Sequence, residues 1–309
     1  MREYPTHIFA GDPLDRVDAA RRDPDWVQAQ IDAESSRFLP FWQMKVLAST
    51  GAQPRLAWRD RGVLAHLADN AEPVLLGVKD RVTHFALDVS GPTDPIAAFD
   101  LDSSLDFIEP RRIATLLPWF ESGTMAHAKS AVDWHARHGF CPRCGSRTRS
   151  NLGGKERLCD TCGAHHFPRT DPVAIMLVHH HDQCLLGRSS GRGTGAYSAL
   201  AGFIDQGESI EEAVRREIME EAHIEVGEVR YHSSQPWPYP SSLMIGCLAQ
   251  ALSTEIRIDD QELDDVGWFA RDEVLRALAR SEEGDETLRV PGPIAIAHHL
   301  LKTWANQDY

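Results

Sequence analysis

Three glutamates at helical spacing are the residues of this sequence best suited to chemistry. Glu217, Glu220 and Glu221 stand at positions i, i+3 and i+4, so on a helix their carboxylates project from one side. Like charges at that spacing disfavour a helix by roughly 0.2–0.5 kcal/mol per pair. Carboxylate oxygens are also the ligands that Mg2+ and Mn2+ prefer, and such cations would neutralise the repulsion. The spacing indicates a divalent-metal site, and its alternative is a solvated acidic helix face.

The residues beside these glutamates indicate how such a helix is placed. Ile210, Val214 and Ile218 form an adjoining apolar stripe, which predicts that part of the helix packs against a sheet. Arg216 is placed to form a charge-assisted pair with Glu208. We expect this pair to fix the geometry of the loop that enters the helix.

Four of the six cysteines form a second constellation. Two CxxC pairs are separated by fourteen residues, and a glycine that permits a tight turn follows each pair. Four thiolates would close the coordination shell of one structural zinc ion and leave no position for a reactive water. A redox-active pair is the alternative. The predicted zinc ligands are Cys141, Cys144, Cys159 and Cys162.

The elements that must position these groups alternate between strands and helices. Helices are predicted at about Ser209–Ala222 and Pro293–Trp304. The strands are predicted at Val173–His179, Cys184–Arg188, Tyr197–Gly202, Met244–Ala251 and Val266–Phe269. Strands interleaved with helices are typical of an α/β layered domain with a mixed sheet.

The region before the cysteines contains no residues whose chemistry can be named. Pro73–Ser90 predicts a β-hairpin around a turn at Lys79, Asp80 and Arg81. From Pro110 onward the pattern becomes helical, and Gly123 is expected to separate two helical pieces.

Composition and charge restrict the classes of function. The 309 residues carry a formal net charge of −14, which argues against a protein whose main task is to coat nucleic acid. Between Arg137 and Arg169, however, seven basic residues face two acidic ones, a local net charge of +5. We see no secretory or membrane-spanning segment, and the two CxxC pairs suit a reducing compartment. We therefore expect a cytoplasmic protein without a membrane partner.

The helical motif resembles the Nudix box. Gly202, five residues, Glu208, seven residues and then Arg216-Glu217-Ile218-Met219-Glu220-Glu221 match its fixed positions, and only His223 replaces the final glycine. That position is expected to end the helix in a left-handed conformation. The resemblance implies hydrolysis of a nucleoside diphosphate linkage with two or more Mg2+ or Mn2+ ions, in which Glu217, Glu220, Glu221 and the Ala201 carbonyl hold the metal. It further implies that Glu221 is the general base.

A proline-rich segment narrows the resemblance to one branch. Ser234-Gln-Pro-Trp-Pro-Tyr-Pro-Ser-Ser242 is similar to the SQPWPFPxS signature of NADH pyrophosphatases and NAD-capped RNA hydrolases, which also carry a four-cysteine module before the Nudix domain. A rigid connection over the core is the structural alternative. The resemblance implies a further metal ligand at Glu262 and an adenine sandwich between Phe167 and Phe203. It implies that the dinucleotide site is lined by Gln235, Pro236, Trp237, Pro238, Tyr239, Pro240, Ser241 and Ser242, with a backbone contact from Ala297.

This resemblance gives a full set of expectations. Residues 1–125 form an α+β domain, residues 126–168 a helix and zinc ribbon with one structural Zn2+ per chain, and residues 169–309 a Nudix α/β/α sandwich. The implied activity is cleavage of NADH or NAD+ to a nicotinamide mononucleotide and AMP, and removal of NAD caps from RNA 5′ ends, by a homodimer. The alternatives are a general hydrolase of ADP-ribose or dinucleoside polyphosphates and a zinc-ribbon nucleic-acid adaptor.

Overall fold

The computed structural model describes residues 7–68, 71–189, 195–258, 263–279 and 288–307. The chain divides into two compact units, which are considered separately below. The N-terminal unit comprises residues 8–170 and 237–241, and the C-terminal unit comprises residues 1–7, 171–236 and 242–309. No helix among the described ranges is long and apolar enough to cross a membrane.

The N-terminal unit is built on a five-stranded sheet with the order β3-β4-β1-β2-β5. Its strands are β1 (Arg37–Trp42), β2 (Lys45–Ser49), β3 (Val74–Lys79), β4 (Val82–Asp88) and β5 (Leu105–Ile108). The β1–β4 pair is parallel, whereas the other pairs are antiparallel. The predicted hairpin is confirmed: β3 and β4 are joined by Asp80 and Arg81, both with positive φ.

Short helices surround this sheet, and one long helix packs against it. The short helices are η1 (Ala20–Arg22), α1 (Pro24–Asp32), η2 (Arg61–His66), α2 (Pro95–Ala98) and α3 (Pro110–Ile113). The long helix α4 (Trp119–Arg137) contacts β1, β3 and β4. Its core-facing residues include Met125, Ala128 and Val132.

The predicted break at Gly123 is wrong. The helical segment is interrupted before Trp119, because Pro118 is the extended N-cap residue of α4. Gly123 lies inside α4 for a different reason. A Cβ at this position would come 2.6 Å from both the Ala10 oxygen and the Asp12 nitrogen. The glycine therefore lets the N-terminal segment of this unit pass directly over the helix.

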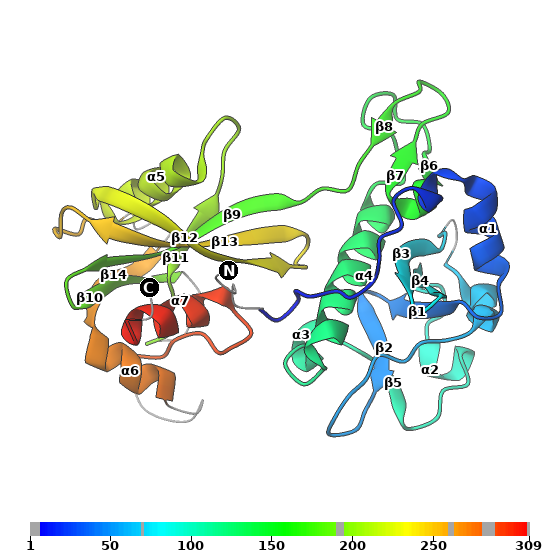
Figure 1. Ribbon diagram of the computed structural model, residues 1–309, viewed down its shortest axis with the longest axis horizontal. Helices are drawn as coiled ribbons and strands as arrows, with labels where there is room; N and C mark the ends of the chain where they lie inside the picture. The colour runs from blue at the N-terminus through cyan, green and yellow to red at the C-terminus, as the bar shows by residue number, and fades with distance from the viewer. Residues whose placement is uncertain (1–6, 69–70, 190–194, 259–262, 280–287, 308–309) are drawn as a thin grey trace. The chain divides into compact units, whose positions relative to one another are not determined.

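After α4 the chain enters a small three-stranded sheet with the order β6-β7-β8. Its elements are β6 (Arg149–Asn151), η3 (Leu152–Gly154), β7 (Glu156–Leu158) and β8 (His165–His166). This sheet stands beyond the end of α4 (Figure 1), and η3 contacts β3 of the five-stranded sheet. The first CxxC pair lies in a turn before β6, and the second lies in the turn between β7 and β8.

The C-terminal unit contains a six-stranded mixed sheet. Strands β12 (Val226–Trp237), β13 (Ser242–Ala251), β9 (Asp171–His180), β10 (Gln183–Ser189) and β14 (Leu263–Ala270) lie in that order, and β11 (Leu200–Phe203) pairs with β9. The β9–β13 pair is parallel and the β10 and β11 pairs are antiparallel. The proline-rich segment begins inside β12, which contains Pro236 and is an edge strand of the sheet, in agreement with the confinement of proline to edge strands.

Helices cover both faces of this sheet, as Figure 1 shows. Even-numbered residues of β9, such as Met176, pack in one core cluster with Val214 and Ile218 of α5 (Ile210–Ala222). The odd-numbered Ile175 and Leu177 pack in another cluster with α6 (Arg271–Ala279) and α7 (Ile296–Ala305). Because side chains alternate along a strand, β9 is buried on both faces. The predicted α/β/α sandwich is thereby confirmed.

We predict that Gly123→Ala destabilises the chain. The added Cβ would meet two backbone atoms that lack the freedom of a side chain, so overpacking should outweigh the gain in helix propensity of about 1 kcal/mol. We expect a net loss of about 1–2 kcal/mol in unfolding free energy, measured by urea denaturation. Gly51→Ala is the matched control, because nothing lies within 4 Å of a Cβ there. Equal stability of the two variants would contradict the assignment.

Candidate active site

The helix that carries the three glutamates has defined signals at both ends. At its start, the Ser209 hydroxyl accepts a hydrogen bond from the Glu212 N–H (3.3 Å), and the Glu212 carboxylate accepts one from the Ser209 N–H (2.8 Å). This reciprocal capping box satisfies donors that the first turn leaves unpaired. At its end, His223 adopts the left-handed conformation with φ 59° and ψ 34°. The expectation that histidine takes over the terminal glycine role is thus confirmed.

The three glutamates do not share one environment. Glu217 and Glu221 are buried, at 9% and 7% relative exposure, whereas the Glu220 side chain is 58% exposed. The two buried residues lie one turn apart, on the side that adjoins Val214 and Ile218 in the core. A solvated acidic face would leave all three exposed, so this alternative fails for Glu217 and Glu221. Burying carboxylates is costly unless a positive charge compensates them.

Gly202 at the end of β11 makes room for the Glu217 carboxylate. A Cβ on Gly202 would lie 1.9 Å from Glu217 Cδ and about as close to both carboxylate oxygens. No side chain fits at that distance, so the first residue of the motif must be glycine for steric reasons. Gly202 pairs with Ala174 and Ala201 pairs with Ile175, which fixes the backbone beside the carboxylate to the central strand β9.

Arg216 connects the loop, the strand and the helix. Its guanidinium donates to both Glu208 oxygens (2.6 and 2.8 Å), to Glu217 (2.8 Å) and to the Phe203 carbonyl (2.9 Å). The two hydrogen bonds from Arg216 to Glu208, with a further one from the Asp205 N–H, lower the pKa of Glu208 to about 2. The predicted Arg216–Glu208 pair is confirmed. Its further contact with Glu217 was not predicted, because side chains at positions i and i+1 of a helix do not ordinarily face each other.

Divalent cations fit this set of residues. Glu217 and Glu221 offer hard oxygen ligands from a covered helix face, and the glycine backbone approaches one of them closely. Ala201 is half-buried next to that glycine. Glu262, the further expected ligand, lies outside the described residues. Within the described ranges the carboxylates do not form a group of three ligand atoms close enough together to hold one ion.

The four cysteines do form a closed cluster. Their sulfur atoms all lie within 4.8 Å of one another, and the Cys141–Cys162 and Cys144–Cys159 separations are 3.7 and 3.5 Å. A tetrahedral zinc with Zn–S bonds of about 2.3 Å places sulfurs about 3.8 Å apart. Convergence of all four argues against an isolated redox pair. Gly145 and Gly163, each with positive φ, donate their N–H groups to the carbonyls of Cys141 and Cys159, which closes both turns.

Two further groups act on the sulfurs and were not predicted. The Ser146 backbone N–H and hydroxyl lower the pKa of Cys144 to about 6, which favours the thiolate that zinc binds. His166 Nε2 lies 3.3 Å from Cys141 Sγ, at a distance where an N–H can donate to sulfur. The spacing of the cysteines contains no signal for either contact.

Residues 237–241 of the proline-rich segment belong to the N-terminal unit, and other residues of that unit hold them in place. The Trp237 and Tyr239 rings lie edge-on to Phe9 at 5.7 and 6.0 Å. The Arg111 guanidinium lies over both rings at 5.2 and 5.8 Å. Buried Lys129 donates to the Pro238 carbonyl at 2.7 Å and lies over the Tyr239 ring at 4.8 Å. These partners fix the conformation of the segment and occupy part of the surface of its aromatic rings.

The remaining predicted site residues have distinct positions. Gln235 is fully buried; its amide oxygen accepts from the Ile296 N–H and its amide nitrogen donates to the Ile294 carbonyl, both at 2.8 Å. It therefore caps the start of α7, where Ala297 is also buried. Phe203 is 60% exposed in the C-terminal unit and Phe167 is 64% exposed in the N-terminal unit. Each offers a free aromatic surface for stacking.

Comparison with known families accounts for most of the chain, from residue 35 to residue 289. The NUDIX domain family matches residues 168–289, the NADH pyrophosphatase zinc ribbon domain matches residues 136–167, and the NADH pyrophosphatase-like rudimentary NUDIX domain matches residues 35–134. The chain belongs to the NADH pyrophosphatase and NAD-capped RNA hydrolase family of Nudix enzymes. The region in which no chemistry could be named is thus a degenerate relative of the catalytic domain.

Individual relatives agree with this family. The chain is 38% identical to the NAD-capped RNA hydrolase NUDT12 of Homo sapiens, over 96% of this chain and 73% of that protein. It is 32% identical to the NAD-capped RNA hydrolase of Schizosaccharomyces pombe, over 99% of this chain and 94% of that protein. It is 36% identical to the NAD-capped RNA hydrolase NudC of Mycobacterium bovis, over 79% of each chain.

We predict that Gly202→Ala weakens binding of Mn2+. The added Cβ must displace the Glu217 carboxylate, and residues that orient a ligand commonly change metal affinity by roughly 10–100-fold. Calorimetric titration with Mn2+ should therefore show an affinity at least about ten-fold lower. Gly267→Ala on β14 is the control, because its nearest neighbour would be at an ordinary 3.4 Å. Unchanged affinity in Gly202→Ala would refute the steric role assigned to this glycine.

We also predict that Cys159→Ser removes zinc from the chain. Elemental analysis should find one zinc ion per parent chain and markedly less in the variant, because a serine hydroxyl is a poor zinc ligand. Cys184→Ala should keep its zinc, since Cys184 is a buried core residue of the C-terminal unit. Zinc retained at the parent level in Cys159→Ser would rule out the four-thiolate site.

Proposed function

We propose that this protein hydrolyses the pyrophosphate bond of NADH and NAD+ to a nicotinamide mononucleotide and AMP, and removes NAD caps from RNA 5′ ends. The observation that carries the proposal is the pair of buried carboxylates, Glu217 and Glu221, which lie one turn apart, with Glu217 against the Gly202 backbone. The family to which the chain belongs, and relatives named as NAD-capped RNA hydrolases, support the choice of substrate.

The proposed reaction is attack of water on a phosphorus atom of the pyrophosphate bridge. The P–O bond to the bridging oxygen breaks, and the other nucleotide leaves as a phosphate monoester. Bound divalent cations would screen the negative charges and lower the pKa of the attacking water. Glu217, Glu220, Glu221 and the Ala201 carbonyl would hold them, with Glu262 as a further ligand.

Within this scheme the protein's own residues orient the reactants and accept a proton. Glu221 is the proposed general base, since it is buried at 7% exposure and lies on the ligand side of α5. Arg216 keeps Glu217 and the entering loop in place through its contacts with Glu208 and the Phe203 carbonyl. The exposed Phe203 ring, and separately Phe167, are the proposed stacking partners for adenine.

The segment from Gln235 to Ser242 is proposed to serve the dinucleotide. Gln235 fixes the start of α7 next to Ala297, and Arg111 and Lys129 hold Trp237 and Tyr239. A segment that is already rigid loses little entropy when a ligand binds. This stiffness favours an enzyme for NAD-type dinucleotides over a general hydrolase of ADP-ribose.

Three finer points complete the proposal. The catalytic ions are Mg2+ or Mn2+, both of which suit carboxylate ligands. The active form is a homodimer, as closed two-fold assemblies are the commonest kind. The protein works in the cytoplasm, where its six free cysteines stay reduced.

The function is tested by comparing NADH, ADP-ribose and NAD-capped RNA as substrates, with and without divalent metal. We predict metal-dependent turnover of NADH and of the capped RNA, and a loss of about 10²–10⁴-fold in kcat for Glu221→Gln, the usual contribution of a general base. Products are identified by chromatography.

Glu211→Gln is the matched control, because Glu211 is exposed on the same helix; it should keep full activity. Faster turnover of ADP-ribose than of NADH would contradict the substrate, and full activity of Glu221→Gln would contradict the base.

A further inference from the structure

The zinc ribbon differs in charge from the rest of the chain. Residues 139–167 contain five Lys or Arg and two acidic residues, in a chain whose net charge is −14. Neither acidic side chain neutralises the remaining basic residues of the ribbon. Asp160 pairs with Arg149 at 3.0 Å, and Glu156 is buried, with Asn151 and His165 as partners. The exposed face of the ribbon is therefore locally positive.

Two exposed arginines of the ribbon have no acidic partner among the residues that the structure describes. Arg149 is paired with Asp160, Lys155 with Asp18, and Arg157 is buried against Thr148. Arg143 and Arg147 are both exposed, and among the described residues neither forms an ion pair. Unpaired, exposed guanidinium groups are available to bind phosphate.

An exposed aromatic ring lies beside one of these arginines. Phe140 is 58% exposed and pairs through an isolated β-bridge with Arg147. The Arg147 guanidinium lies 5.2 Å from the centre of the Phe140 ring, within the range of a cation–π interaction. One exposed ring alone is common on protein surfaces. A ring covered by a guanidinium, with a second exposed arginine in the turn between them, suits single-stranded nucleic acid, because bases stack on the flat groups while arginines contact phosphates.

We propose that Phe140, Arg143 and Arg147 form a surface on the zinc ribbon that binds single-stranded RNA without sequence preference. The inference rests on the proposed function only in its choice of RNA as the chain that follows the 5′ nucleotide. The four thiolate ligands hold the turn between Phe140 and Arg147, since Cys141 and Cys144 lie between them in the sequence. A stacking platform on such a turn is rigid before RNA arrives, which lowers the entropic cost of binding.

The primary test measures binding of uncapped, 5′-phosphorylated single-stranded RNA to the full zinc-loaded chain by fluorescence anisotropy. This ligand contains no NAD, so the result does not depend on the proposed hydrolysis. We expect the parent to bind it, with affinity that falls as salt rises, and to bind duplex RNA of the same length more weakly, because paired bases are not free to stack. No detectable binding of single-stranded RNA by the parent at low salt would overturn the proposal.

Two kinds of variant separate the stacking from the charge contribution. Phe140→Leu should weaken binding by roughly ten-fold and leave its salt dependence unchanged, since it removes a stacking face and no charge. Phe140→Tyr should restore parent affinity. Arg143→Ala combined with Arg147→Ala should weaken binding and reduce the slope of log K against log salt concentration by about 1.4, or about 0.7 for each lost phosphate contact.

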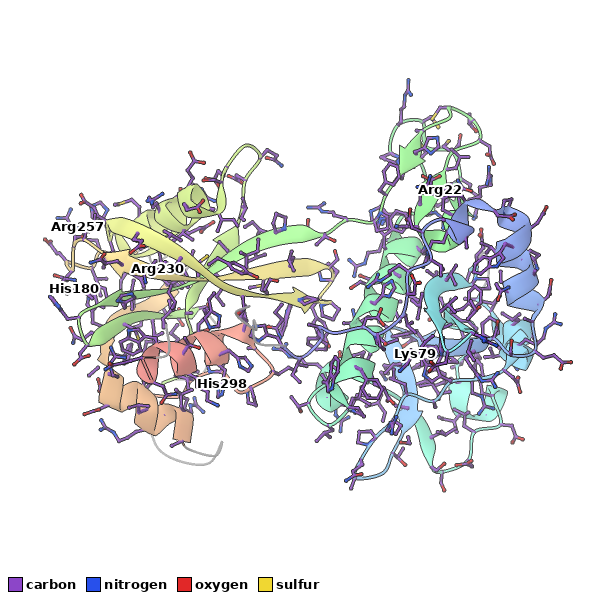
Figure 2. All side chains as sticks on the ribbon, viewed as in Figure 1. Arg22, Lys79, His180, Arg230, Arg257 and His298 are labelled. Atoms are coloured by element: carbon purple, nitrogen blue, oxygen red, sulfur yellow. The ribbon has the colours of Figure 1, made fainter. Side chains whose placement is uncertain are left out.

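The matched control is Arg22→Ala. Arg22 is 72% exposed on η1 and is paired with Asp18 at 3.1 Å; it lies at the side of the N-terminal unit near the ribbon (Figure 2). This variant should bind RNA as the parent does. An equal loss in the control, or parent-like binding by both ribbon variants at normal zinc content, would overturn the proposal.

A second readout connects the surface to catalysis. If the parent hydrolyses NADH, the ribbon variants should raise the KM for NAD-capped RNA by about the factor lost in RNA binding, with the kinetics on NADH unchanged. If the parent does not hydrolyse NADH, the proposed function fails while the binding experiment still decides the surface. An equal KM increase for NADH and capped RNA would assign these residues to the nucleotide site and contradict the proposal.

Discussion

The structure of the C-terminal unit depends on the close contact between a carboxylate and a backbone. Glu217 of α5 lies against Gly202 of β11 at a distance that excludes even a methyl group. The contact requires α5 to pack in a fixed register on the sheet, which Val214 and Ile218 provide from the core. It also requires β11 to be held by β9. The loop, the capping box and the left-handed turn at His223 then set where the helix begins and ends.

The same contact explains the charges around it. A carboxylate taken out of water destabilises the fold unless a positive group compensates it. Arg216 does so for Glu217 while it also pairs with Glu208 and a β11 carbonyl. Glu221 is buried one turn further along the helix. Retaining two such groups on one helix face makes physical sense where divalent cations share them, and this connects the fold to the chemistry of phosphate transfer.

Local signals in the sequence predicted local structure well. Spacing, turn chemistry and periodicity predicted five features that the structure confirms. These are the Lys79–Val82 turn, the two cysteine knuckles with their glycines, the extent of α5, the Arg216–Glu208 pair and the layered sheet. The family was also predictable, because the Nudix box between Gly202 and His223 has fixed residues at fixed spacing. Such a motif identifies a site even when the residues that contact it from other parts of the chain are unknown.

Long-range contacts were not predictable from the sequence. Gly123 was read as a helix break because its contact with Ala10 and Asp12, more than a hundred residues away, leaves no local trace. Nothing in the sequence around Lys129 and Arg111 indicated that their side chains contact the Trp237–Tyr239 segment. Glu220 is exposed whereas Glu217 and Glu221 are buried, and this difference depends on which side of α5 packs against the sheet. The first region contains no such motif, and its match to a rudimentary NUDIX domain came only from comparison with known families.

The central claim is that the buried pair Glu217 and Glu221 holds the catalytic cation. The most direct measurement is anomalous diffraction at the manganese edge from crystals grown with Mn2+ and nucleotide. Our account predicts an anomalous peak in direct contact with carboxylate oxygens of both residues, close to the Ala201–Gly202 backbone. Bound nucleotide with no manganese peak beside these two carboxylates would contradict it.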